Sequence, residues 1–199
     1  MRVVVSTHLD DAVFSCYALL GPGTVVVTVL AGVPPEGVLG DWDEAGGAAS
    51  SHRRVLERRA EDERALALAG ATPVHLDFPD SQYWEALGEP SAAAVSDALR
   101  TYLDGEVYAP AGIGNPDHIL VRDAVLAVRP DAVLYADLPY ALRHGFGRYG
   151  RDIWLDDDAA ARKIAAASCY ATQLEQLAAD FGDFLAPAAV RRERVFPGR

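Results

Sequence analysis

The chain has 199 residues, of which 50% are hydrophobic and 24% are charged, and this is the composition of a soluble globular domain. Its formal net charge of −11 argues against nucleic acid or an anionic membrane as a partner, because both bind basic surfaces. No stretch has the apolar length needed to span a bilayer, and the short run after Met1 is not typical of a secretory signal. We therefore expect one domain over residues 1–199, located in the cytoplasm.

The two cysteines, Cys16 and Cys169, are too few for a disulfide framework. Both lie in apolar helical patterns, so we expect buried free thiols in a reducing compartment.

Short runs rich in β-branched residues alternate with longer helical patterns along the chain. The predicted strands cover Arg2–Ser6, Thr24–Leu30, Pro73–Phe78, Glu106–Ala109 and Ala132–Ala136. The predicted helices cover Asp11–Leu20, Ser50–Ala69, Ala92–Leu103, Asp117–Val128 and Asp157–Ala179, and Ala31–Gly47 is predicted to be a long loop. This alternation indicates an α/β fold, with a mostly parallel sheet and helices on both faces.

Polar or glycine-rich segments follow four of the predicted strands. Ligands of open parallel sheets bind outside the carboxyl ends of the strands, so we expect these segments to converge at one edge. They are His8–Asp11, Phe78–Ser81, Pro110–Asn115 and Asp137–Tyr140.

The first of these segments carries His8, Asp10 and Asp11 directly after the apolar run Val3–Val5. An unpaired carboxylate in a dry site is unfavourable, and a divalent cation supplies the opposing charge. His8 and Asp11 are three residues apart at a strand-to-helix turn, so both can face one ion while Asp10 acts as a base. Helix capping by Asp10 or Asp11 is the alternative, and it would explain one acid but not two acids and a histidine.

A third ligand is predicted in the segment Asn115-Pro116-Asp117-His118. Asn115 is a good N-cap, Pro116 suits the first helical position, and His118 then lies near the positive end of a helix, which favours a neutral imidazole. By itself this pattern also describes a surface histidine in a well-capped first turn. Together with His8 and Asp11 it favours Zn²⁺, with an open position for water.

These motifs resemble the PIG-L / LmbE family of zinc-dependent N-acetylglucosaminyl deacetylases. His8-Leu9-Asp10-Asp11 and Asn115-Pro116-Asp117-His118 are similar to the family's two principal motifs. Further similarities are the Arg-x-x-Glu-Asp pattern of Arg58–Asp62, the segment Leu76–Tyr83, which resembles the one that lines the family's sugar pocket, and the C-terminal residues Lys163, Tyr170, Thr172 and Gln173.

The resemblance implies a Rossmann-like single domain that hydrolyses the acetamide of an N-acetyl amino sugar or of a glycosylated small molecule. It implies that His8, Asp11 and His118 hold zinc and that Asp10 is the general base. Iron or manganese remains an alternative to zinc. No feature of the sequence specifies an oligomeric state.

Two positions depart from the family pattern. Ala12 stands where glutamate is frequent, and Asn115 stands where the second motif has a histidine that helps to stabilise the tetrahedral intermediate. Loss of one such donor costs about 100- to 1000-fold in rate. Asn115 is therefore a catalytic candidate that still donates a hydrogen bond. Substrate-binding residues are expected at Asp80, Tyr83, Arg143 and His144, of which the last three are candidate substitutes for the missing donor.

Two other functions fit parts of the sequence. Asn115 motivates a catalytically weak or inactive member that binds sugars or acts as a regulator. Acids after the first strand are also found in phosphatases, but the chain lacks an Asp-x-Asp-Gly loop and a glycine-rich phosphate cradle after that strand.

Overall fold

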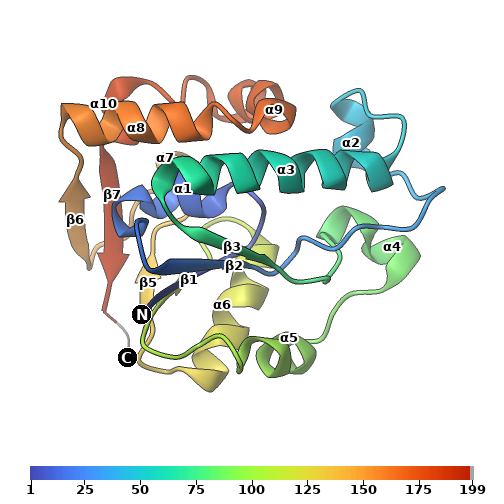
Figure 1. Ribbon diagram of the computed structural model, residues 1–199, viewed down its shortest axis with the longest axis horizontal. Helices are drawn as coiled ribbons and strands as arrows, with labels where there is room; N and C mark the ends of the chain where they lie inside the picture. Colours follow the sequence, from blue (N-terminus) through green and yellow to red (C-terminus); the bar gives the residue numbers. More distant parts are fainter. Residues whose placement is uncertain (198–199) are drawn as a thin grey trace.

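The computed structural model describes residues 1–197 as a seven-stranded sheet between two layers of helices (Figure 1). The strands are β1 (Arg2–Ser6), β2 (Thr24–Thr28), β3 (Thr72–His75), β4 (Glu106–Pro110), β5 (Val133–Tyr135), β6 (Arg151–Trp154) and β7 (Arg192–Phe196). Their order across the sheet is β3-β2-β1-β4-β5-β7-β6. Strands β1 to β5 run parallel, and β7 is antiparallel to β5 and β6. The predicted mostly parallel α/β sheet is confirmed.

Helices cover both faces of this sheet. They are α1 (Asp11–Cys16), α2 (Asp41–Ala45), α3 (Ser51–Ala69), α4 (Trp84–Leu87), α5 (Ala92–Leu99), α6 (Pro116–Val128), α7 (Tyr140–His144), α8 (Asp157–Ala167), α9 (Ala171–Phe181) and α10 (Pro187–Val190). Helices α5 and α6 lie on one face, and α1, α3, α8 and α9 lie on the other (Figure 1). None of the helices within residues 1–197 combines the length and apolar character needed to cross a membrane.

The central strand β1 is buried on both faces. Val3, Val4 and Val5 are all fully inaccessible to solvent, as an uninterrupted apolar run in a covered parallel strand predicts. Alternate side chains enter different cores, because successive side chains of a strand point to opposite faces. Val4 packs with residues of α1, α3 and α8, whereas Val3 and Val5 pack with residues of α5 and α6.

The strand order reverses direction between β1 and β4. The chain winds from β1 through β2 to β3 on one side, and β4 then pairs with the free edge of β1. The segments that leave these two strands therefore diverge and open a crevice at their carboxyl ends. His8–Asp11 follows β1 and Asn115–His118 follows β4, so the two candidate motifs lie at this switch point.

The prediction of a single C-terminal helix over Asp157–Ala179 is wrong, because the chain forms α8 and α9 with a break between them. Tyr170, in the break, is buried and donates a hydrogen bond to Asp62 of α3 at 2.8 Å. Glu61 of α3 accepts hydrogen bonds from both the backbone amide and the hydroxyl of Thr172. These contacts supply hydrogen-bond partners at the start of α9, and the local sequence does not specify that start.

Strands β6 and β7 have no counterpart among the predicted elements. In β7 the buried residue Glu193 replaces an apolar side chain and obscures the pattern of alternating hydrophobicity. Its carboxylate binds Lys163, the only lysine of the chain, at 2.7 Å and accepts hydrogen bonds from the backbone amides of Tyr17 and Ala18. A buried ion pair of this kind is favourable only where additional hydrogen bonds support it, and the two backbone amides supply them to the Glu193 carboxylate.

Smaller differences concern the ends of elements. The predicted helix Asp11–Leu20 is α1 followed by a 3-10 turn over Tyr17–Leu19, and the predicted loop Ala31–Gly47 contains the short helix α2. Both cysteines are free thiols, with Cys16 buried and Cys169 half-buried.

Candidate metal centre and active site

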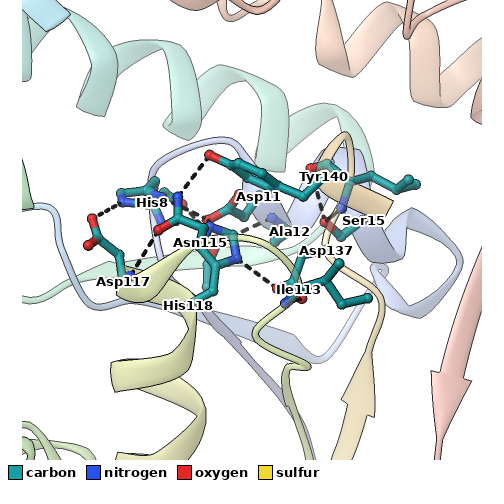
Figure 2. Close-up of polar contacts among 12 residues, drawn as sticks. His8, Asp11, Ala12, Ser15, Ile113, Asn115, Asp117, His118, Asp137 and Tyr140 are labelled. Atoms are coloured by element: carbon teal, nitrogen blue, oxygen red, sulfur yellow. Dashed lines mark hydrogen bonds and ion pairs between the residues drawn. The ribbon is translucent and has the colours of Figure 1, made fainter. Parts of the chain in front are cut away.

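Three predicted ligands, His8, Asp11 and His118, meet at the switch point (Figure 2). The Oδ2 atom of Asp11 lies 3.2 Å from Nδ1 of His8 and 3.4 Å from Nε2 of His118. The same oxygen accepts a hydrogen bond from the backbone amide of His8 at 2.8 Å, which fixes the carboxylate against the turn after β1.

The remaining nitrogen of each imidazole is bound by a second carboxylate. Nδ1 of His118 lies 2.7 Å from Asp137, and Nε2 of His8 lies 3.1 Å from Asp117. In the neutral imidazoles these carboxylate partners favour the ring proton on those nitrogens, and Nε2 of His118 and Nδ1 of His8 then face Asp11 with their lone pairs. The second oxygen of Asp137 accepts the backbone amide of Ile113 at 2.7 Å, which orients the whole group.

This donor set fits a metal ion. Nε2 of His118 is buried and has no hydrogen-bond partner among the residues described. Nitrogen and oxygen ligands about 2.0–2.1 Å from a tetrahedral zinc ion lie about 3.3–3.4 Å from one another, close to the spacings observed here. A second set, His8 with Asp80 and Asp117, also meets the spacing of a metal site, but it uses the His8 nitrogen that faces Asp117.

Carboxylates dominate the electrostatics of the centre. Burial lowers the pKa of His118, but Asp11 and Asp137 outweigh this effect and raise the pKa above its ordinary value. These carboxylates oppose the effect of the helix start, which by itself disfavours the charged imidazolium. Burial also lowers the pKa of His8, and the hydrogen bonds to Asp11 and Asp117 again produce a net rise. The same negative field attracts a cation.

Asp10 does not cap helix α1. It occupies the N-cap position, yet its side chain makes no capping hydrogen bond, and it lines the cavity beside His8. Burial, together with the like charge of Asp11, raises the pKa of Asp10 to about 7. The capping alternative is thus excluded for this residue, and its carboxylate faces the cavity.

Asn115 caps α6 and also contacts a residue that sequence reasoning missed. Its Oδ1 atom accepts the backbone amide of Asp117 at 2.9 Å, and its Nδ2 atom donates to the hydroxyl of Tyr140 at 2.9 Å (Figure 2). The ring of Tyr140 lies edge-on to His118, with ring centroids 5.1 Å apart. Burial raises the pKa of Tyr140 to about 12, so its hydroxyl keeps its proton at neutral pH.

The centre opens into a cavity of about 590 Å³. Helices α2 and α9 form much of its wall, through Trp42 and through Leu177 and Phe181. The indole nitrogen of Trp42 donates to Gln173 at 2.9 Å and links the two helices in the cavity wall.

Three of the four predicted substrate-binding residues lie in the cavity wall, namely Asp80, Tyr83 and Arg143. Asp80 uses one oxygen to cap the turn that follows it, and Tyr83 donates its hydroxyl proton to Asp43 at 2.5 Å. His144 is exposed and is not among the described residues that line the cavity, which leaves it without the expected substrate contact.

Arg143 also makes contacts of its own. Its guanidinium group packs over the ring of Phe181, 4.5 Å from the centroid, and donates to the backbone carbonyl of Asp180.

Several residues of the site received no role from the sequence. Asp137 and Tyr140 follow β5, and their segment did carry a signal, because it was predicted to reach this edge of the sheet. The sequence signal for Arg58 and Trp42 was weaker. Arg58 is buried at the cavity wall and forms an ion pair with Asp43 at 2.6 Å, which only the packing of α3 against α2 reveals.

The carboxylate of Asp10 lies beside the three candidate metal ligands, at the switch point of a Rossmann-like sheet. This is the arrangement of a metal-assisted hydrolase. A family model described as GlcNAc-PI de-N-acetylase (PIG-L) matches residues 3–129, a range that includes both principal motifs. The chain belongs to this family, so the resemblance is confirmed, and it is a deacetylase.

Solved structures of related proteins support the assignment over almost the whole chain. The A40926 pseudoaglycone deacetylase is 28% identical, with a TM-score of 0.80 over 98% of this chain and 96% of its own. The zinc-inhibited form of a teicoplanin deacetylase is 25% identical, with a TM-score of 0.82 over 99% and 97%. The N,N'-diacetylchitobiose deacetylase of Pyrococcus horikoshii, 15% identical with a TM-score of 0.64 over 99% and 84%, shares the fold. No curated protein matches the chain.

Proposed function

We propose that the protein is a zinc-dependent N-deacetylase that hydrolyses the acetamide of an amino sugar carried by a larger small molecule. The observation that carries the proposal is the free carboxylate of Asp10 beside the meeting point of His8, Asp11 and His118. Family membership and the similarity to deacetylases of glycosylated small molecules support the type of reaction.

His8, Asp11 and His118 would hold the metal, and two nitrogens with one carboxylate are a donor set that suits zinc. When bound, the ion would polarise the acetamide carbonyl and lower the pKa of a water molecule. Asp117 and Asp137 keep the two imidazoles in the tautomers that ligation requires.

Asp10 would move the proton in both halves of the reaction. It accepts a proton from water while the water oxygen bonds to the carbonyl carbon. As the carbon–nitrogen bond breaks, Asp10 returns that proton to the departing nitrogen. The products are acetic acid and the free amine, and Asp10 ends in its starting state.

The cavity favours a substrate larger than one sugar. A volume of about 590 Å³ lies within the range typical of pockets for drug-sized ligands. Asp80 lies close to the centre, 3.8 Å from His8, where sugar hydroxyls need polar partners. Trp42, Leu177 and Phe181 offer apolar surface for a group attached to the sugar.

The test combines metal analysis with a panel of acetamides. Purified protein is expected to contain about one zinc ion per chain and to release amine faster from N-acetylglucosaminides with an apolar aglycone than from free N-acetylglucosamine. Asp10→Asn is expected to lower kcat by about 100-fold or more without loss of metal. Asp158→Asn, an exposed change of the same chemistry at the start of α8, is the control.

Two results would contradict the proposal. Turnover unchanged in Asp10→Asn would remove the base from the mechanism. Sugar binding without amine release from any compound would favour the catalytically inactive alternative that Asn115 motivates.

A further inference from the structure

The orientation of the Asn115 amide is fixed by chemistry. The backbone N–H of Asp117 can only donate, so the group that faces it at 2.9 Å must be the side-chain oxygen of Asn115. The amide nitrogen then faces Tyr140, and because it can only donate, the phenolic oxygen of Tyr140 must be the acceptor. This single N-cap therefore determines the direction of the hydrogen bond between two side chains from different elements.

The acceptor role leaves the phenolic proton of Tyr140 free. No other hydrogen bond within residues 1–197 involves this hydroxyl, and Tyr140 lines the cavity that contains Asp10 and His8. A hydroxyl that accepts a hydrogen bond also becomes a stronger donor, because the two bonds polarise each other.

The ring of Tyr140 is held by two aromatic contacts. His118 packs edge-on against it at 5.1 Å between centroids, and Phe181 of α9 does so at 5.2 Å. Asn115 is the N-cap of α6 and His118 lies in the first turn of that helix, so the amide and the imidazole are both held at the helix start. Hydroxyl, amide and metal-type ligand are thus fixed relative to one another (Figure 2).

We propose that Tyr140 is the oxyanion donor of the deacetylation and that Asn115 is the positioning residue that directs its hydroxyl proton into the cavity. This inference rests on the proposed function. As water adds to the acetamide carbon, the carbonyl electron pair moves onto oxygen, and Tyr140 donates a hydrogen bond to that oxygen without transferring its proton. The oxygen returns the pair to carbon when the carbon–nitrogen bond breaks.

The donors expected from the sequence have partners of their own or lie outside the described cavity lining. Tyr83 gives its proton to Asp43, and Arg143 binds the carbonyl of Asp180 while its guanidinium covers Phe181. His144 is exposed outside the described cavity lining.

Tyr140→Phe is the first test, because it removes the hydroxyl and keeps the ring between His118 and Phe181. We expect kcat to fall about 100- to 1000-fold, with KM within about threefold of the wild-type value and unchanged metal content. A methylphosphonamidate analogue of the acetamide, which carries a tetrahedral anionic centre, is expected to lose affinity in parallel with kcat, as measured by calorimetry. Wild-type analogue affinity in this variant would overturn the proposal.

Asn115→Asp tests the positioning role with the cap intact. One carboxylate oxygen still accepts the amide of Asp117, but the other can only accept from Tyr140, so the phenolic proton turns away from the cavity. We expect a loss of kcat similar to that of Tyr140→Phe, and little further loss when the two changes are combined. Additive losses in the double variant would refute the positioning role, since they would show that Asn115 acts independently of Tyr140.

Asn115→Ser completes the series, because serine keeps the cap but offers no amide donor to Tyr140. Its expected rate lies between those of the wild type and Asn115→Asp. Failure of the proposed function is recognisable separately, since wild-type protein would then release no amine. If the wild type is active and Tyr140→Phe is within threefold of it, only the present inference fails.

Discussion

Replacement of Asp137 by asparagine is predicted to weaken metal binding through the tautomer of His118. Asp137 is fully buried and uses one oxygen for His118 and the other for the amide of Ile113, each at 2.7 Å. Because the Ile113 amide can only donate, the single oxygen of asparagine must face it, and the asparagine NH₂ then faces Nδ1 of His118. The imidazole proton moves to Nε2, the atom that faces Asp11, and blocks ligation there.

Changes to groups that orient metal ligands cost about 10- to 100-fold in affinity, or about 1.4–2.7 kcal/mol. Zinc affinity is measured by competition with a chromogenic chelator, and far-UV circular dichroism checks the fold. Asp137→Ala separates the tautomer from the charge, because both variants are neutral but alanine leaves His118 free to choose its tautomer. We expect a larger loss for asparagine than for alanine, and none for the exposed control Asp97→Asn. A smaller loss for asparagine than for alanine would refute the reasoning.

Two further predictions concern the wall of the cavity. Glu61→Ala is expected to lower the free energy of unfolding by about 1.5–3 kcal/mol, because it removes a charged hydrogen-bond acceptor of Thr172. Hydrogen exchange should show the loss of protection first in α9. Uniform loss of protection across the chain would contradict a local anchor. Gly32→Ala is expected to lower the free energy of unfolding, measured by urea denaturation, by about 1–3 kcal/mol. The new Cβ atom would lie 2.7 Å from the carbonyl oxygen of Asp77. Gly21→Ala, whose Cβ meets nothing within 4 Å, is the control, and equal costs would disprove the steric cause.

The sequence by itself determined the features that local chemistry specifies. The run Val3–Val5 is apolar at every position, so it predicts a strand buried on both faces, and β1 is such a strand. Ser50 and Gly70 bracket α3 because an N-cap hydroxyl and a left-handed C-cap glycine need no distant partner. The alternation of strands and helices likewise predicted the parallel sheet and the meeting of His8 and His118 at one edge.

Only the tertiary structure decided the contacts that depend on the strand order. The break before α9 exists because Glu61 and Asp62 of a distant helix satisfy its first residues, whereas the local sequence reads as a continuous helix. Asp137 reaches His118, and Tyr140 reaches Asn115, because β5 pairs with β4 and delivers its following segment beside α6. A local pattern supplies the residue types of this site, but the geometry that gives each proton its direction arises from packing between segments far apart in the chain.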